Sequence, residues 1–113
     1  MKDRESSELP PLAERRPAPR RRVIWRGRGV HLGGGYNFEC TIRDLSDSGA
    51  RISVRGAPII PSRFHLINVT TRTIHEVKVV WNDGKLLGLQ FLKSFRVDAI
   101  PDPDLAYLKG FAR

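Results

Sequence analysis

Two short polar stretches of the chain carry the side chains best suited to bind a ligand. The first is the run Arg15–Arg22, which contains two prolines, and the second is Asp44–Gly49, with the sequence Asp-Leu-Ser-Asp-Ser-Gly. The planar fork of an arginine fits both a phosphate and the O6/N7 edge of guanine. A carboxylate such as that of Asp44 accepts hydrogen bonds from the N–H groups on the other guanine edge. We therefore expect the two stretches to meet in space and bind an anionic ligand that contains guanine.

The second stretch also has the composition of a tight turn. Asp and Ser side chains accept hydrogen bonds from nearby backbone N–H groups, and Gly49 is expected to supply a residue with positive φ. An ordinary connection between two strands accounts for the same residues without any ligand. The arginines upstream in the sequence are the feature that favours a ligand-binding role for this turn.

Positive charge is concentrated near the N-terminus. The 113-residue chain has a formal net charge of +8, and residues 14–28 hold seven arginines and one glutamate. A local basic segment on a nearly balanced body indicates an anionic partner, although a solvated basic arm has the same composition. We expect residues 1–13 to be a disordered tail and residues 14–22 an extended linker, because Pro17 and Pro19 exclude a helix.

The rest of the chain has the alternating pattern of half-buried strands. Apolar side chains recur at every second position in Phe38–Arg43 and Ala50–Arg55, and Asn82–Lys85 has the composition of a hairpin turn. Closing so short a sheet removes its exposed edges, so we predict an all-β, six-stranded antiparallel barrel. The expected strands are Arg28–Leu32, Phe38–Arg43, Ala50–Arg55, Phe64–Val69, Ile74–Trp81 and Leu86–Leu92.

A short helix is expected after the barrel. Asp102 followed by Pro103 has the pattern of an N-cap with proline at the first helical position, and Leu105 and Leu108 would share one face. We expect this helix to cap the barrel. The predicted organisation is a tail at 1–13, a barrel domain at 14–98 and the helix at 99–113.

Catalysis and metal binding have no support in the sequence. The three histidines are far apart, Cys40 is the only cysteine, and Ser46 has no evident histidine partner. No apolar run approaches the length of a membrane span, and the first twelve residues lack a signal-peptide core. We expect a cytoplasmic protein that is not an enzyme and needs no cofactor.

The two polar stretches together resemble the motifs of the PilZ domain. Arg16–Arg20 matches the pattern Arg-x-x-x-Arg, and Asp44–Gly49 matches Asp/Asn-x-Ser-x-x-Gly. The following Ala50-Arg51-Ile52 and the ending Gly88-Leu89-Gln90-Phe91 are also similar to that family. The resemblance covers about residues 14–95.

The resemblance implies a barrel that binds the bacterial second messenger cyclic di-GMP. Arg16 and Arg20 would clasp guanine and phosphate, Asp44 and Ser46 would contact guanine, and Gly49 would keep the turn open. Arg15 would add a contact. Because Arg15, Arg21 and Arg22 add donors beyond the two arginines of the motif, we expect two ligand molecules per chain, as an intercalated dimer. The ligand-binding residues implied are Arg15, Arg16, Arg20, Asp44, Ser46 and Gly49.

The resemblance also implies an adaptor that passes the signal to a downstream protein, in motility, biofilm or polysaccharide regulation. Two alternatives stay open. One is a small barrel that binds nucleic acid, for which arginines and aromatics are not interleaved as expected. The other is a PilZ-like protein-interaction domain that binds no nucleotide.

Overall fold

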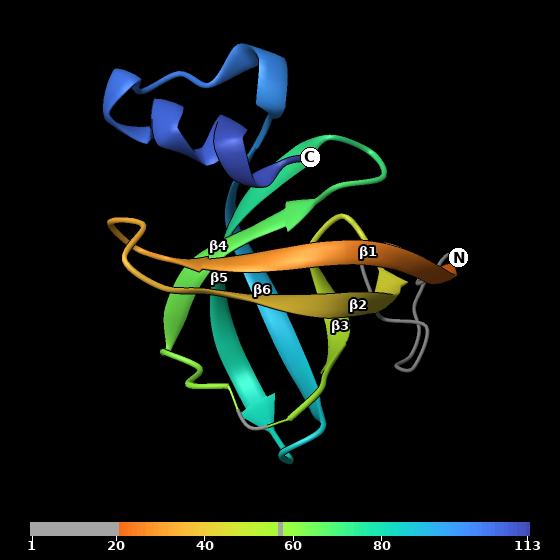
Figure 1. The fold of residues 1–113 in the computed structure, drawn as a ribbon. Coiled ribbons are helices and arrows are strands. Elements are labelled where there is room, and N and C mark those ends of the chain that lie inside the picture. The colour runs from red at the N-terminus through yellow and green to blue at the C-terminus, as the bar shows by residue number, and fades with distance from the viewer. Residues whose placement is uncertain (1–20, 57) are drawn as a thin grey trace, which may run out of the picture.

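The computed structural model describes residues 21–56 and 58–113, and within them six antiparallel strands close into a barrel. The order of strands around the barrel is β1-β2-β3-β6-β5-β4 (Figure 1). This confirms the predicted fold class. The expected tail at 1–13 and the linker through Arg20 lie outside the described residues. The strands are β1 (Arg21–His31), β2 (Asn37–Leu45), β3 (Gly49–Val54), β4 (Arg63–Asn68), β5 (Thr73–Asn82) and β6 (Leu86–Arg96).

The first strand begins seven residues earlier than expected. Arg21 and Arg22 are already part of β1, where they pair with Leu45 and Asp44 of β2. Val23 and Trp25 pack against the barrel core, which makes this segment barrel wall and not linker. Gly27 and Gly29 lack the side chains that would have revealed the alternation in the sequence.

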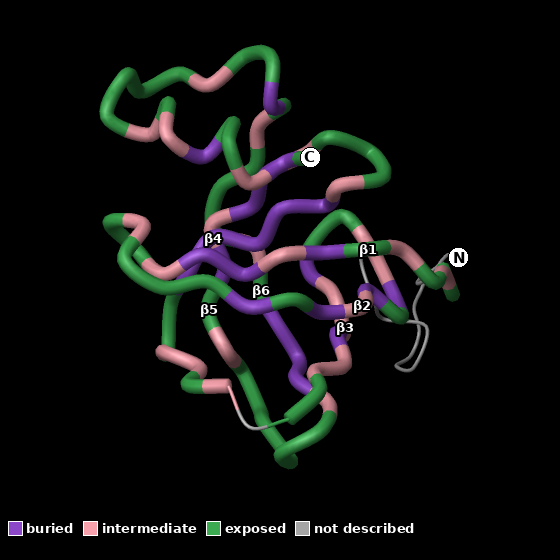
Figure 2. The backbone as a smooth tube through the Cα atoms, in the orientation of Figure 1, coloured by how far each residue is buried: buried purple, intermediate pink, exposed green. Residues whose placement is uncertain are grey.

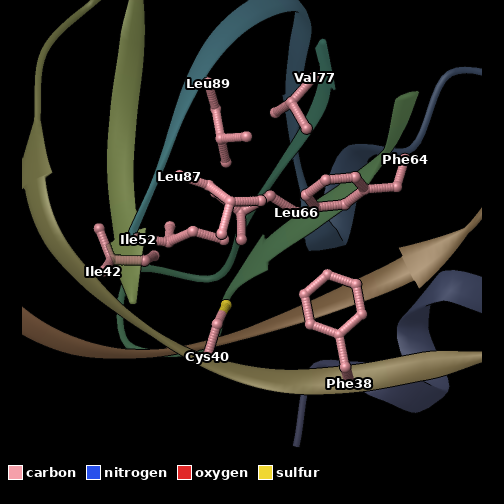
Figure 3. Close-up of a cluster of buried hydrophobic side chains, with 9 residues drawn as sticks. All are labelled: Phe38, Cys40, Ile42, Ile52, Phe64, Leu66, Val77, Leu87 and Leu89. Carbon is pink, nitrogen blue, oxygen red and sulfur yellow. The ribbon is translucent and has the colours of Figure 1, made fainter. Parts of the chain in front are cut away.

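The barrel interior is filled by the alternating apolar residues that the sequence indicated. Phe38, Cys40 and Ile42 of β2 all point inward and are buried (Figure 3). Burial raises the pKa of the Cys40 thiol to about 12, so this cysteine is a packing residue and not a nucleophile. The other buried members of the cluster are Ile52, Phe64, Leu66, Val77, Leu87 and Leu89.

The hairpin turn between β5 and β6 forms as predicted. Asp83 Oδ1 accepts hydrogen bonds from the backbone N–H groups of Lys85 at 3.0 Å and Leu86 at 2.8 Å, and these bonds lower the pKa of the Asp83 carboxyl. Gly84 has a φ of 97°, which a glycine adopts without steric cost.

The C-terminal segment packs against the outer wall of the barrel, where we had expected it to cap the barrel. It contains η3 (Val97–Ala99) and the 3-10 helix η4 (Pro103–Phe111), and Asp102 caps η4 as predicted by accepting from the N–H of Asp104. Leu66 and Ile67 are neighbours on β4 and therefore face opposite sides of the sheet. Leu66 belongs to the interior cluster, whereas Ile67 packs with Leu108 of η4. Both faces of β4 are consequently buried (Figure 2).

His75 is a buried titratable group on the inner face of the barrel. It pairs with Leu66, stacks on Phe91 with ring centroids 3.9 Å apart, and its Nδ1 lies 2.6 Å from Ser94 Oγ. Burial lowers the pKa of His75 from 6.5 to about 4, and burial lowers that of His65 as well. Between pH 6.5 and pH 4 the unfolded chain therefore binds protons that the folded chain does not.

We expect the free energy of unfolding to fall as pH drops through this window. The His75 contribution amounts to roughly 3 kcal/mol across the full window, at about 1.4 kcal/mol per pH unit. Urea unfolding at pH 7.5 and pH 4.5 measures the loss. His75→Asn, which keeps a polar atom near the Nδ1 position but does not titrate, should reduce it, while His65 accounts for part of the remainder. An equal loss in the variant and the wild type would contradict this assignment.

Candidate functional site

The candidate site begins at the turn between β2 and β3. The backbone N–H of Ser46 donates to the carbonyl of Gly49 at 2.9 Å, which closes the turn. Ser46 Oγ accepts from the N–H of Ser48 at 3.3 Å and lies 3.4 Å from the Gly49 carbonyl oxygen. The hydroxyl thus stabilises its own turn, as expected for a serine at such a position.

Asp44 belongs to the strand β2, although we had expected it in the turn. It is 5% exposed, and Arg51 of β3 is its partner in the sheet. The Nε of Arg51 donates to Asp44 Oδ2 at 2.6 Å, and the Nη2 of Arg51 lies 2.5 Å from the same oxygen. This charge-assisted contact fixes both side chains.

A β-bulge places Asp44 on the outer wall. Ile42 pairs with Ile52, but Asp44 pairs with Arg51, so β2 advances by two residues while β3 advances by one. The extra residue, Arg43, reverses the alternation of β2. Asp44 therefore faces outward with Arg51, although strict alternation from Ile42 would have turned it inward.

A second bulge brings Trp81 to the same outer wall. Val79 pairs with Leu89 and Trp81 pairs with Gly88, which makes Val80 the extra residue. Alternation along the expected strand Ile74–Trp81 predicts one common face for Val77, Val79 and Trp81, and this prediction is wrong for Trp81 because the bulge reverses the alternation. The indole lies directly over Gly88, with its Nε1 2.2 Å from the point that a Cβ would occupy, and Trp81 is 43% exposed.

These pairings set five residues side by side across five strands of the outer wall. Arg22 pairs with Asp44, Asp44 with Arg51, Arg51 with Gly88, and Gly88 with Trp81. In this register the acidic residue Asp44 lies between two arginines, of which Arg51 engages its carboxylate, and Trp81 lies at the far end of the row. We call this set of five residues the cross-strand row.

A hollow of about 480 Å³ lies beside the cross-strand row. Its lining combines three arginines with apolar side chains, which suits a ligand that has both flat rings and negative charge. The described lining residues are Arg22, Val23, Ile24, Arg43, Arg51 and Leu86.

Gly49 is required for a reason other than the one expected. It is absent from the positive-φ residues of the described chain, so the turn does not demand left-handed backbone. A Cβ at this position would lie 2.2 Å from the backbone oxygen of Leu89 on β6. The missing side chain lets the turn approach β6 closely, where the N–H of Phe91 donates to the Ser48 carbonyl at 2.9 Å.

The structure brings together the predicted residues Asp44, Ser46 and Gly49. Arg15, Arg16 and Arg20 lie outside the described residues. The sequence analysis missed Arg51 and Trp81 as parts of this surface, whereas Arg22 belongs to its first polar stretch. A turn closed by Ser46 and Gly49 sets Asp44 opposite Arg51, so the hairpin register was the signal that could have identified Arg51.

Within residues 21–56 and 58–113, no three His, Cys, Asp or Glu side chains gather as a metal site would require. In the same part of the chain, no helix is both long and apolar enough to cross a bilayer. What the described site offers is a set of hydrogen-bond donors, one anchored carboxylate and an aromatic face.

The described part of the chain is thus a closed six-stranded antiparallel barrel with this surface on its outer wall. The model of the PilZ domain family matches residues 14–100, and the chain belongs to this family. No curated protein matches the chain. PilZ domains are ligand-binding adaptors of cyclic di-GMP signalling and are not enzymes.

Gly49→Ala tests the close approach of the turn to β6. We expect the added methyl group to push β3 away from the Leu89 carbonyl and to lower the free energy of unfolding by about 1–3 kcal/mol, the usual cost of overpacking. Urea unfolding measures the change. Gly35→Ala is the matched control, because a Cβ there meets nothing within 4 Å and its φ is not positive, and it should stay within about 0.5 kcal/mol of the wild type. A Gly49→Ala variant as stable as the control would contradict the close approach.

Proposed function

We propose that this chain binds cyclic di-GMP on the outer wall of its barrel and acts as a ligand-controlled signalling adaptor. The observation that carries the proposal is the Asp44 carboxylate, which Arg51 engages on the outer wall beside the Ser46–Gly49 turn, with Arg22 as its register partner on β1. Membership of the PilZ family supports the choice of ligand.

The cross-strand row matches the chemistry of a guanine nucleotide. Asp44 already fixes the Arg51 side chain in the free protein. The remaining N–H groups of Arg51 can therefore donate to a phosphate, or to O6 and N7 of guanine, with little further loss of side-chain conformational entropy. Asp44 has a second carboxylate oxygen, Oδ1, which suits the N–H donors of guanine. Ser46 adds a hydroxyl at the turn, as the family pattern implies.

Trp81 gives the row a flat apolar face. Its indole is partly exposed over Gly88, and Gly88 pairs with Arg51 on the next strand. Stacking on an aromatic face contributes about 1–3 kcal/mol for each nucleic-acid base. We assign Trp81 to stacking with one guanine of the ligand.

The arginine motif supplies the remaining contacts in this proposal. Arg20 directly precedes Arg21, the first residue of β1, which pairs with Leu45 at the end of β2 (Figure 1). Strand β1 therefore begins next to the turn. Arg16 and Arg20 would clasp guanine and phosphate from there, and Arg15 would add a further donor.

In this proposal, ligand binding transmits the signal by changing the outer wall of the barrel. Neutralising the arginines and covering the indole changes both the charge and the shape of the wall that a downstream protein meets. Cytoplasmic control of motility, biofilm or polysaccharide systems is the role that we propose for it.

Calorimetric titration with cyclic di-GMP tests the proposal. Arg16→Ala and Arg20→Ala should each weaken binding by about 5- to 150-fold, which corresponds to the roughly 1–3 kcal/mol of a bidentate base contact. Arg96→Ala is the control, because Arg96 is exposed and paired with Asp98 outside the cross-strand row, and it should bind as the wild type does. GTP and a linear dinucleotide that bind as tightly as cyclic di-GMP would refute specific recognition.

The same titration gives the number of ligands per chain. We propose two, as an intercalated dimer, since Arg15, Arg21 and Arg22 add donors beyond those that one molecule needs. Arg21 and Arg22 are exposed at the start of β1 and so remain accessible. A wild-type ratio near one would reject the dimer and leave the primary site intact.

A further inference from the structure

A second, larger hollow lies on the outer wall of β1, β2 and β3. Its volume is about 640 Å³. Its described lining includes core and glycine positions, and its polar and charged members are Arg26, Arg28, Glu39, Thr41, Arg43, Ser53 and Arg55.

The hollow exists because two short side chains lie among long ones. Thr41 of β2 and Ser53 of β3 are partners in the sheet, and Arg26 of β1 pairs with Thr41 on its other side. Arg43 follows Thr41 by two residues and Arg55 follows Ser53 by two. The long arginine side chains therefore surround the two short hydroxyl side chains at the bottom of the hollow.

The charge of the hollow is positive and mostly unneutralised. Glu39 is the acidic residue of its described lining, and Arg28 engages it at 3.3 Å while also donating to Asn37 at 2.8 Å. Arg26 donates to the carbonyl of Arg113 at 2.9 Å, which uses one of its five N–H groups.

Two further arginines have donors to offer. Among the described residues, no acceptor within hydrogen-bond distance is found for the guanidinium of Arg43 or of Arg55. Both side chains are exposed. They are therefore able to donate to an incoming anion.

We propose that this hollow docks an acidic segment of a partner polypeptide. Its arginines come from β1, from β2 and from Arg55 directly after β3, which spreads them over about 10 Å at about 4.8 Å per strand. Carboxylates spaced along an extended chain match this spread better than one compact phosphate does. Bidentate Arg–carboxylate pairs would give the contact its specificity.

The lining argues against a nucleic-acid strand as the occupant. Surfaces that bind single strands stack successive bases on aromatic side chains. The aromatic residue of the described lining is Phe38, which is 6% exposed and belongs to the barrel core. Trp81 is not part of this lining.

The docking surface adjoins the proposed nucleotide site. Arg43 lines both this hollow and the one that contains Arg22 and Arg51. An acidic segment and the nucleotide would thus meet at one arginine, but the docking surface itself does not depend on nucleotide binding.

Fluorescence anisotropy of a labelled octaglutamate peptide, titrated with the full chain in the absence of nucleotide, tests the proposal. The variant Arg26→Glu/Arg55→Glu should bind at least tenfold more weakly than the wild type. The matched control Lys78→Glu/Lys93→Glu makes the same change in net charge on exposed residues of β5 and β6 and should stay within about threefold.

Equal losses in the two double variants would show only general attraction to a basic protein and would overturn the proposal. No loss in Arg26→Glu/Arg55→Glu would also overturn it. An oligothymidine strand that binds more tightly than the peptide and is lost in the same variant would assign the surface to nucleic acid instead. Cyclic di-GMP titration of Arg26→Glu/Arg55→Glu is expected to match the wild type, which separates this test from that of the nucleotide site.

Discussion

The site depends on the alternation of side chains in a closed barrel and on two of the bulges that interrupt it, at Arg43 and Val80. A small barrel must fill its inside with apolar side chains, so each strand turns every second residue inward. Without the bulge at Arg43, regular alternation from Ile42 would turn Asp44 inward, and it would not share a face with Arg51. Without the bulge at Val80, regular alternation from Val79 would turn Trp81 into the core. The bulges let polar and aromatic groups gather on one wall while the interior stays apolar.

The contact between Asp44 and Arg51 links this geometry to function. The Asp44 side chain is only 7% exposed, so its charge is largely removed from water, while that of Arg51 is 34% exposed and reaches solvent. A shielded carboxylate with a partner is stable, but the same carboxylate without its partner is costly. The pair is consequently kept together in the free protein, and the exposed edge of Arg51 is held ready for a ligand.

Sequence patterns predicted the strands with clean alternation, the Asn82–Lys85 turn and the Asp102 cap, because each depends on neighbouring residues. They missed the start of β1, where Gly27 and Gly29 conceal the periodicity. They misplaced Asp44 and Trp81, because a bulge is defined by the partner strand. The need for glycine at position 49 arises from the Leu89 carbonyl on β6, forty residues away along the chain. For the same reason, the cross-strand row emerged only from the register of the strands.

The most direct test of the central claim is a double-mutant cycle on cyclic di-GMP affinity with Asp44→Asn, Arg51→Gln and the pair. If Asp44 acts mainly by holding Arg51 in place for the ligand, the two losses overlap, and the double variant binds about as weakly as Arg51→Gln alone. The coupling energy should then reach about 0.5–3 kcal/mol, the range for residues in contact. Circular dichroism on each variant verifies that the barrel is intact. Fully additive losses, or affinity unchanged in all three folded variants, would contradict the account.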